Sequence, residues 1–156
     1  MLNQKKIEVS MIDEADCKAV WLINNDPEVR AMSFSQNSIP YKEHIKWFQK
    51  KLSDKNSRMY KFVIGNEIAG LIRLEVDQKQ AIVNIAVKKS FRGRGVGSEI
   101  LRLTIILAKE LKLKTLLAEI KQSNKPSLKL FNNLGFLEKE TILINKEKVA
   151  KLELNV

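Results

Sequence analysis

The sequence predicts an α+β fold in which a mixed, largely antiparallel sheet of about seven strands is flanked by about four helices. Three β-rich runs between residues 59 and 87 are joined by turns too tight for a crossover, so these strands must be antiparallel neighbours. A strand-helix-strand-helix unit follows them, and a second hairpin closes the chain. Helices, antiparallel strands and one crossover unit together describe a mixed sheet.

The first third of the chain contains one short strand and two helices in this prediction. Residues 7–9 are a strand candidate, and a helix over residues 14–24 ends at the turn-like sequence of residues 24–27. Pro40 opens a second helix that runs to about residue 55. The i, i+4, i+7, i+11 spacing of its apolar residues predicts one buried stripe. The stripe consists of Tyr41, Ile45, Phe48 and Leu52.

The remaining elements are six strands and two helices. The tight turn Gly65-Asn66 joins the first two β-rich runs, and Gly135 follows the last helix as expected of a residue that ends one. The strands are expected at residues 59–64, 67–76, 80–87, 115–120, 136–144 and 148–154, and the helices at residues 96–111 and 126–134.

The composition fits one globular domain over residues 1–156, with 44% hydrophobic residues and neither a linker nor a repeat. The single cysteine, Cys17, excludes a disulfide scaffold and a zinc ribbon, and no apolar run approaches the roughly 20 residues that span a bilayer. The first residues lack the apolar segment of a signal peptide, so we expect a cytoplasmic protein.

The formal net charge of +10 favours anionic partners, such as nucleic acid, a phosphorylated small molecule or an acidic surface. The lysines are spread along the chain rather than gathered in a tail, and lysines in such patterns usually lie on solvated faces. Charge alone does not choose among these partners.

The most informative segment is the glycine-rich turn Arg92-Gly93-Arg94-Gly95-Val96-Gly97, between a predicted strand and a predicted helix. Glycines allow a sharp turn and a close approach of the backbone to a ligand. The exposed N–H groups of such a turn, with a helix N-terminus behind them, form an anion site to which Arg92 and Arg94 add charge. The turn therefore predicts a site for a phosphate or a pyrophosphate.

Three known phosphate-binding loops compete for this segment. A Walker A loop needs Lys-Ser or Lys-Thr after its last glycine, whereas Gly97 is followed by Ser98-Glu99. A dinucleotide fingerprint needs G-x-G-x-x-G, which the glycine spacing does not match, although Glu119 stands where that fold places its ribose-binding acid. The pattern R/Q-x-x-G-x-G/A fits all six residues. The alternative without function is a plain glycine turn before a helix.

This loop resembles the pyrophosphate loop of the GNAT superfamily of acyl-CoA-dependent N-acetyltransferases. The likeness continues from Glu119 to Phe136, which is similar to the family's strand, its Asn-led helix and its closing Gly-Phe. The resemblance implies a CoA-binding core over about residues 62–137, with acetyl-CoA as co-substrate, no metal, and a homodimer. The residues that it places at CoA are Ile85 and Val87, whose main chain pairs with the pantetheine in the family, Arg92, Gly93, Arg94, Gly95, Val96, Gly97, Asn124 and Ser127.

The segment of about residues 10–60 resembles the acceptor side of GNAT members that acetylate nucleotide-linked deoxyamino sugars in flagellin and surface-glycan pathways. Ribosomal-protein N-terminal acetyltransferases share part of the pattern and are the alternative. The likeness rests on residues 21–30, Ser33, Ile39, His44 and residues 47–48. The candidates for acceptor binding are Arg30, His44 and Glu75. The structural alternatives are an exposed ion pair for Arg30 and a packed core histidine for His44. Glu75 is a second carboxylate on a strand next to that of Glu119, and its alternative is a residue without a part in the reaction.

Acetyl transfer needs a neutral amine, and an alkylammonium with a pKa near ~10.4 is almost wholly protonated at neutral pH. A base must therefore remove a proton, and Glu119, at the end of a strand beside the CoA site, is the first candidate. The alternative is an exposed glutamate paired with Lys121. Backbone N–H groups of the strand at residues 80–87 are expected to stabilise the developing oxyanion.

One residue departs from the family pattern. Many members carry a tyrosine on the last helix as general acid, seven residues after the asparagine, and this position is Phe131 here. Phenylalanine has no proton to donate, so no catalytic acid is assigned, and a scaffold that binds CoA without catalysis stays open. The alternative of another class is a basic domain that binds nucleic acid, although the chain lacks a recognisable nucleic-acid-binding signature.

Overall fold

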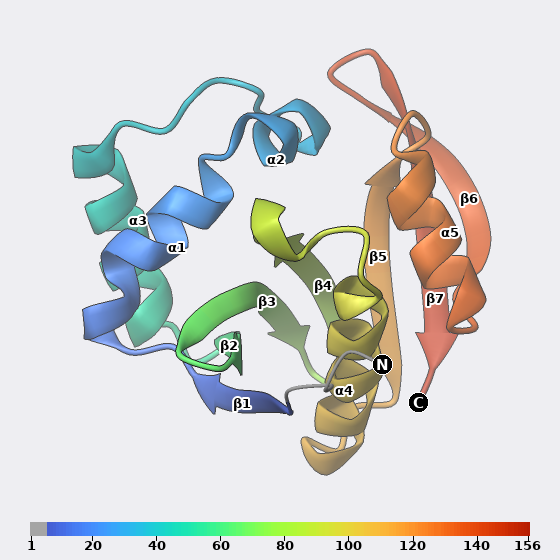
Figure 1. Ribbon diagram of the computed structural model, residues 1–156. Helices are drawn as coiled ribbons and strands as arrows, with labels where there is room; N and C mark the ends of the chain where they lie inside the picture. The colour runs from blue at the N-terminus through green and yellow to red at the C-terminus, as the bar shows by residue number, and fades with distance from the viewer. Residues whose placement is uncertain (1–5) are drawn as a thin grey trace.

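In the computed structural model, which describes residues 6–156, seven strands form one sheet in the order β1-β2-β3-β4-β5-β7-β6 (Figure 1). Among these pairs only β4 and β5 run parallel. The strands are β1 Ile7–Met11, β2 Ser57–Ile64, β3 Glu67–Asp77, β4 Gln80–Val87, β5 Thr115–Lys121, β6 Leu137–Ile144 and β7 Glu147–Asn155.

Five α-helices and two short 3-10 helices accompany the sheet within the described residues. They are η1 Glu14–Asp16, α1 Cys17–Asn24, α2 Pro27–Met32, α3 Tyr41–Ser53, η2 Lys89–Phe91, α4 Val96–Glu110 and α5 Lys125–Asn133. The helices found over residues 6–156 are all too short or too polar to cross a membrane.

The sequence predicts a turn at residues 24–27 and no helix between them and Pro40, whereas the structure contains α2 there. The Asp26 side chain accepts hydrogen bonds from the backbone N–H groups of Glu28 and Val29, and Pro27 occupies the first turn. Asp-Pro is therefore a helix start at this point, because aspartate caps the free N–H groups and proline needs no hydrogen bond there. The same residues also favour turns, which is why the sequence did not separate the two.

The helices cover the two faces of the sheet. One face packs against α4 and α5 in the main core, which includes Ile72, Leu116, Ile100 and Phe131. The other face packs against α1 and α3 in a smaller core. Figure 1 shows α1 and α3 side by side next to β2 and β3, with α4 across the middle of the sheet. Alternate residues of each strand therefore face different helices.

The buried line of α3 differs from the predicted stripe. His44 and Phe48 are each 1% exposed, whereas Tyr41 is 39% exposed. A buried imidazole needs a hydrogen-bond partner, and His44 Nε2 donates to the carbonyl oxygen of Cys17 at 2.8 Å. This partner on α1 turns the helix so that His44 faces inward.

Strands β4 and β5 pair over only three residues, Gln80 to Ile82 against Thr115 to Leu117. Beyond that point β4 keeps its pairing with β3 as far as Val87, and β5 keeps its pairing with β7 as far as Lys121. The facing edges of residues 83–87 and 118–121 have no strand partner among residues 6–156. This divergence leaves backbone hydrogen-bonding groups in the middle of the sheet for another molecule.

Candidate functional site

The glycine-rich turn forms an anion-binding surface at the start of α4. Gly93 and Gly95 have φ angles of 73° and 77°, which side chains other than glycine rarely adopt. A Cβ atom at either position would meet no heavy atom within 4 Å, so the backbone there is open. Gly95 also precedes the first residue of α4, and no side chain caps this helix within the described residues. Its first N–H groups can therefore bind a diphosphate.

The two arginines of the turn have different positions. Arg92 Nε donates to the carbonyl oxygen of Val87 at 3.0 Å, while its terminal nitrogens pair with Glu28 at 2.7 Å and Asp26 at 3.2 Å. Arg92 therefore links the turn to β4 and to the start of α2. Arg94 is exposed and forms no ion pair in the described part of the chain, so it is the arginine with charge to offer a phosphate.

Arg92 also alters the acidity of its partner. Burial raises the pKa of Asp26, but the hydrogen bond and charge of Arg92, with backbone N–H groups, outweigh it and hold the pKa below its ordinary value. The sequence contained a signal for Asp26 as a helix cap, but none for its pairing with a residue 66 positions away.

The free edge of β4 carries the two residues that were expected to pair with pantetheine. The Lys88 N–H group donates to the carbonyl oxygen of Ala69, the residue before the last β3 partner of β4. Because hydrogen-bonded residues alternate along an antiparallel pair, the main-chain groups of Ile85 and Val87 point the other way, toward β5. An extended ligand can therefore add to this edge like a strand. The Val87 carbonyl oxygen already accepts from Arg92.

The last two expected CoA residues lie at the start of α5. Asn124 Oδ1 accepts a hydrogen bond from the Ser127 N–H group at 3.3 Å and thereby caps the helix. Gly97 lies opposite this helix, since a Cβ atom there would be 3.5 Å from Leu130 and 3.6 Å from Val87. The small residue therefore allows α4 to start close to both β4 and α5.

Phe131, in the place of the family tyrosine, is 1% exposed. Its ring contacts Phe136 edge-on, with centroids 4.9 Å apart. This side chain is part of the main core.

Glu119 lies on β5 at the divergence from β4 and is half-buried. Its neighbours Ala118 and Ile120 face the main core, so Glu119 faces the opposite side of the sheet together with Lys121. The alternative of a Glu119–Lys121 pair is not what the structure contains, because Lys121 pairs with Glu147 at 2.9 Å. Glu119 itself forms no ion pair among residues 6–156.

The three candidates for acceptor binding are not brought together. Arg30 donates from its guanidinium to the Ser35 carbonyl oxygen, and burial lowers its pKa. Burial also lowers the pKa of His44, only partly opposed by its bond to Cys17. These placements favour internal roles for Arg30 and His44.

Glu75 also takes part in an internal cluster. Its carboxylate accepts from Lys51 Nζ at 2.7 Å and lies 2.7 Å from Arg73 Nε. The Arg73 guanidinium in turn lies over the ring of Trp47, 5.2 Å from its centroid. This placement favours a structural role for Glu75, in ion pairs that the sequence did not predict.

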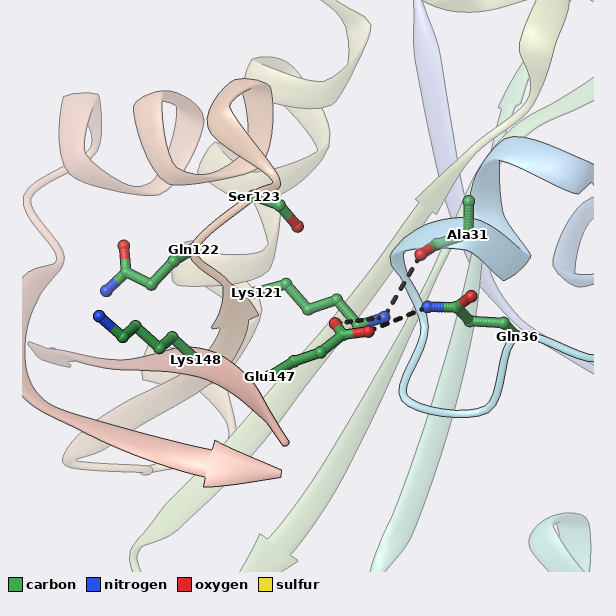
Figure 2. Close-up of a pocket in the computed structure, with 7 residues that line it drawn as sticks. All are labelled: Ala31, Gln36, Lys121, Gln122, Ser123, Glu147 and Lys148. Carbon is green, nitrogen blue, oxygen red and sulfur yellow. Dashed lines mark hydrogen bonds and ion pairs between the residues drawn. The ribbon is translucent and has the colours of Figure 1, made fainter. Parts of the chain in front are cut away.

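A cavity of about 430 Å³ at the end of β5 was not expected from the sequence (Figure 2). Lys121, only 4% exposed, lies in its wall. The signal in the sequence is a second charged residue at the end of a mainly apolar strand, two residues after Glu119. The lining residues are Ala31, Gln36, Lys121, Gln122, Ser123, Glu147 and Lys148.

The family comparison covers most of the chain. A family model described as an acetyltransferase (GNAT) domain matches residues 6–137. YwnH of Bacillus subtilis (strain 168), a provisionally named phosphinothricin acetyltransferase, is 45% identical over 60 residues. This match spans 38% of the chain and 37% of YwnH, so it reaches about a third of that relative's length.

Solved structures with the same fold extend along nearly the whole chain. Spermidine N-acetyltransferase from Vibrio cholerae, in complex with CoA and spermine, has a TM-score of 0.89 at 16% identity, covering 98% of this chain and 96% of its own. The protein yncA from Salmonella typhimurium, with its cofactor acetyl-CoA, has a TM-score of 0.79 at 16% identity, covering 96% and 92%. At these identities the likeness concerns the fold.

These findings confirm the expected α+β fold and the expected class, a GNAT-type N-acetyltransferase domain. Enzymes of this class use acetyl-CoA, and the relatives named above are not described as acting on a nucleotide sugar. The chain belongs to the acetyltransferase (GNAT) domain family.

Proposed function

We propose that this protein transfers the acetyl group of acetyl-CoA to the primary amine of a small acceptor, by direct attack of the amine on the thioester. We propose further that the acceptor is a nucleotide-linked deoxyamino sugar. The observation that carries the proposal is the uncapped, glycine-lined start of α4 next to the free edge of β4.

Acetyl-CoA supplies the activated acyl group, and residues of the chain hold the two reactants in place. In this proposal the N–H groups from Gly93 to Gly97 hold the diphosphate, and Arg94 adds its charge. The main-chain groups of Ile85 and Val87 hold the extended pantetheine arm, with Asn124 and Ser127 beside it. Placing both reactants in one site removes much of the entropic cost of their encounter.

Glu119 takes the proton from the acceptor ammonium, directly or through a water. Only about one alkylamine in 2500 is neutral at pH 7, so this step decides how much acceptor can react. A free β4 N–H group stabilises the negative charge that develops on the thioester oxygen. No side chain is assigned to protonate the leaving thiolate, since a thiol pKa near that of cysteine, ~8.5, makes unassisted departure tolerable.

The support for the acceptor class is the resemblance of residues 10–60 together with the charge of the chain. A diphosphate-linked acceptor is anionic, and the net charge of +10 attracts it to the protein. The segment of residues 10–60 is proposed as the acceptor side and residues 62–137 as the CoA side. Asp26, which caps α2, and Glu28 in its first turn pair with Arg92 and join these two parts.

The test is thiol release from acetyl-CoA with a panel of amines: a nucleotide-linked amino sugar, a free amino sugar, a peptide N-terminus, phosphinothricin and spermidine. Turnover of the nucleotide-linked sugar supports the full proposal. Turnover of the peptide alone assigns the protein to the ribosomal-protein type instead. No release with any amine would remove the proposed activity.

The base is tested with Glu119→Gln, and Glu110→Gln is the control because Glu110 is an exposed residue at the end of α4. We expect kcat to fall about a hundredfold or more in Glu119→Gln and not in the control. Unchanged turnover in Glu119→Gln would remove the base assignment and leave the activity intact.

A further inference from the structure

The cavity at the end of β5 is open to solvent and is lined by segments far apart in the sequence. Figure 2 shows Lys121 between the end of α2, the loop that carries Gln36 and the β6–β7 hairpin. The hairpin is fastened to this loop, because Asn145 donates to the carbonyl oxygen of Phe34 at 3.2 Å. The volume of the cavity, about 430 Å³, lies within the range of small-molecule sites.

The carboxylate in this cavity has both oxygens occupied. Glu147 Oε2 lies 2.9 Å from Lys121 Nζ, and Oε1 accepts from the Gln36 amide at 3.2 Å. Two of the roughly four acceptor sites of this carboxylate are therefore used within the protein. Glu147 is also the only acidic residue among the lining residues, so a polyamine would have to share this one counter-ion with Lys121.

The donors in the cavity are not all used. Besides Glu147, Lys121 Nζ has one further partner within residues 6–156, the carbonyl oxygen of Ala31 at 3.3 Å. An ammonium group has three hydrogens, so one donor of this buried cation is free. The Ser123 hydroxyl points toward Lys121 in Figure 2. Lys148 adds a second positive charge, although Figure 2 shows its ammonium beside Gln122, away from Lys121.

The cavity lies next to the proposed base. Glu119 and Lys121 are on the same face of β5, and alternate residues of a strand are about 7 Å apart. A group held by Lys121 would therefore belong to the same small molecule as an amine held at Glu119. This step rests on the proposed function.

We propose that this cavity binds an acidic group of the acceptor, a phosphate or a carboxylate, with Lys121 as its counter-ion. The acceptor class is then an amine that carries an acid. The free N–H donor of Lys121, the hydroxyl of Ser123 and the excess of one positive charge among the lining residues suit such a group. An ion pair with a buried cation is also stronger than one with an exposed cation.

The experiment compares wild type, Lys121→Met and Lys109→Met on two pairs of acceptors. A nucleotide-linked amino sugar is paired with the free amino sugar, and an ω-amino carboxylic acid is paired with an alkylamine of similar length, so that phosphate and carboxylate are tested separately. Lys109 is an exposed residue of α4, and Lys109→Met changes the net charge by the same amount as Lys121→Met.

We expect Lys121→Met to raise the KM of the acidic member of a pair about tenfold or more, and to leave the KM values of the member without an acid and of acetyl-CoA within about twofold. Lys109→Met should change neither. An equal KM for acidic acceptors in Lys121→Met and Lys109→Met overturns the proposal, as does a wild type that prefers spermidine or the members without an acid.

A second variant keeps the buried lysine in place. Glu147→Gln removes the competing carboxylate, so we expect the KM for acidic acceptors to fall. A KM that does not fall counts against the proposal, and a rise would mean that Glu147 itself binds the ammonium. This variant decides the matter even if Lys121→Met does not fold, which circular dichroism would reveal. Absence of thiol release with every amine is a different result, because it removes the proposed function and this inference with it.

Discussion

Replacement of Arg92 by methionine removes three interactions that fasten the glycine-rich turn to β4 and α2. The pair with Glu28 contributes little, because that side chain is 67% exposed. The bond to the Val87 carbonyl oxygen and the pair with Asp26, which is 17% exposed, contribute about 1 kcal/mol each. We expect a loss of about 2 kcal/mol, which lowers Tm by about 4–8 °C in a chain of this length.

The effect should depend on pH in a defined direction. The pKa of Asp26 is lower in the folded state than its ordinary value of 3.8. The ionised Asp26 carboxylate therefore makes its full contribution to the free energy of unfolding above that pH. It is lost as the pH falls through the folded pKa and Asp26 becomes protonated. The difference in Tm between wild type and Arg92→Met should therefore shrink below about pH 4.

The assay is thermal unfolding followed by circular dichroism at pH 7, 5 and 3, without acetyl-CoA. Arg94→Met is the matched control, because it makes the same charge change in the same turn at an exposed residue. Equal Tm values for the two variants at pH 7 would refute the reasoning. A difference that persists undiminished at pH 3 would refute the part assigned to Asp26.

Three further outcomes are expected. Gly95→Ala, at a φ of 77° but without a clash, should cost about 1–2 kcal/mol of stability and raise the acetyl-CoA dissociation constant about tenfold, measured by calorimetry. Gly70→Ala, whose Cβ atom would lie 2.4 Å from Ile100 Cδ1 and 3.0 Å from the Ala86 carbonyl oxygen, should lose about 1–3 kcal/mol in urea unfolding. Because burial lowers the pKa of His44, the one histidine of the chain, stability should fall as the pH drops below 6.5, and His44→Gln should abolish that slope between pH 7 and 5.

Local chemistry determined much of the fold from the sequence alone. The β4 strand has the predicted bounds, Gln80 to Val87, because alternating apolar residues and tight turns act over a few neighbouring positions. The turn at residues 145–147 and the glycine-rich loop were predicted for the same reason. Asp-Pro was the exception, since its local chemistry fits both a turn and a helix start.

The tertiary structure decided which of the candidate side chains have partners. His44 is enclosed by Cys17 and the aromatic residues of α3, and Arg92 reaches two carboxylates at the start of α2. Lys121 became a buried cation because Ala31 and Glu147 lie against it, 90 and 26 positions away in the chain. Periodicity and turn chemistry carry no information about such distant contacts, and the divergence of β4 from β5 is likewise a property of the whole sheet. Burial and ion pairing depend on all the segments that surround a group, and only the folded chain brings those segments together.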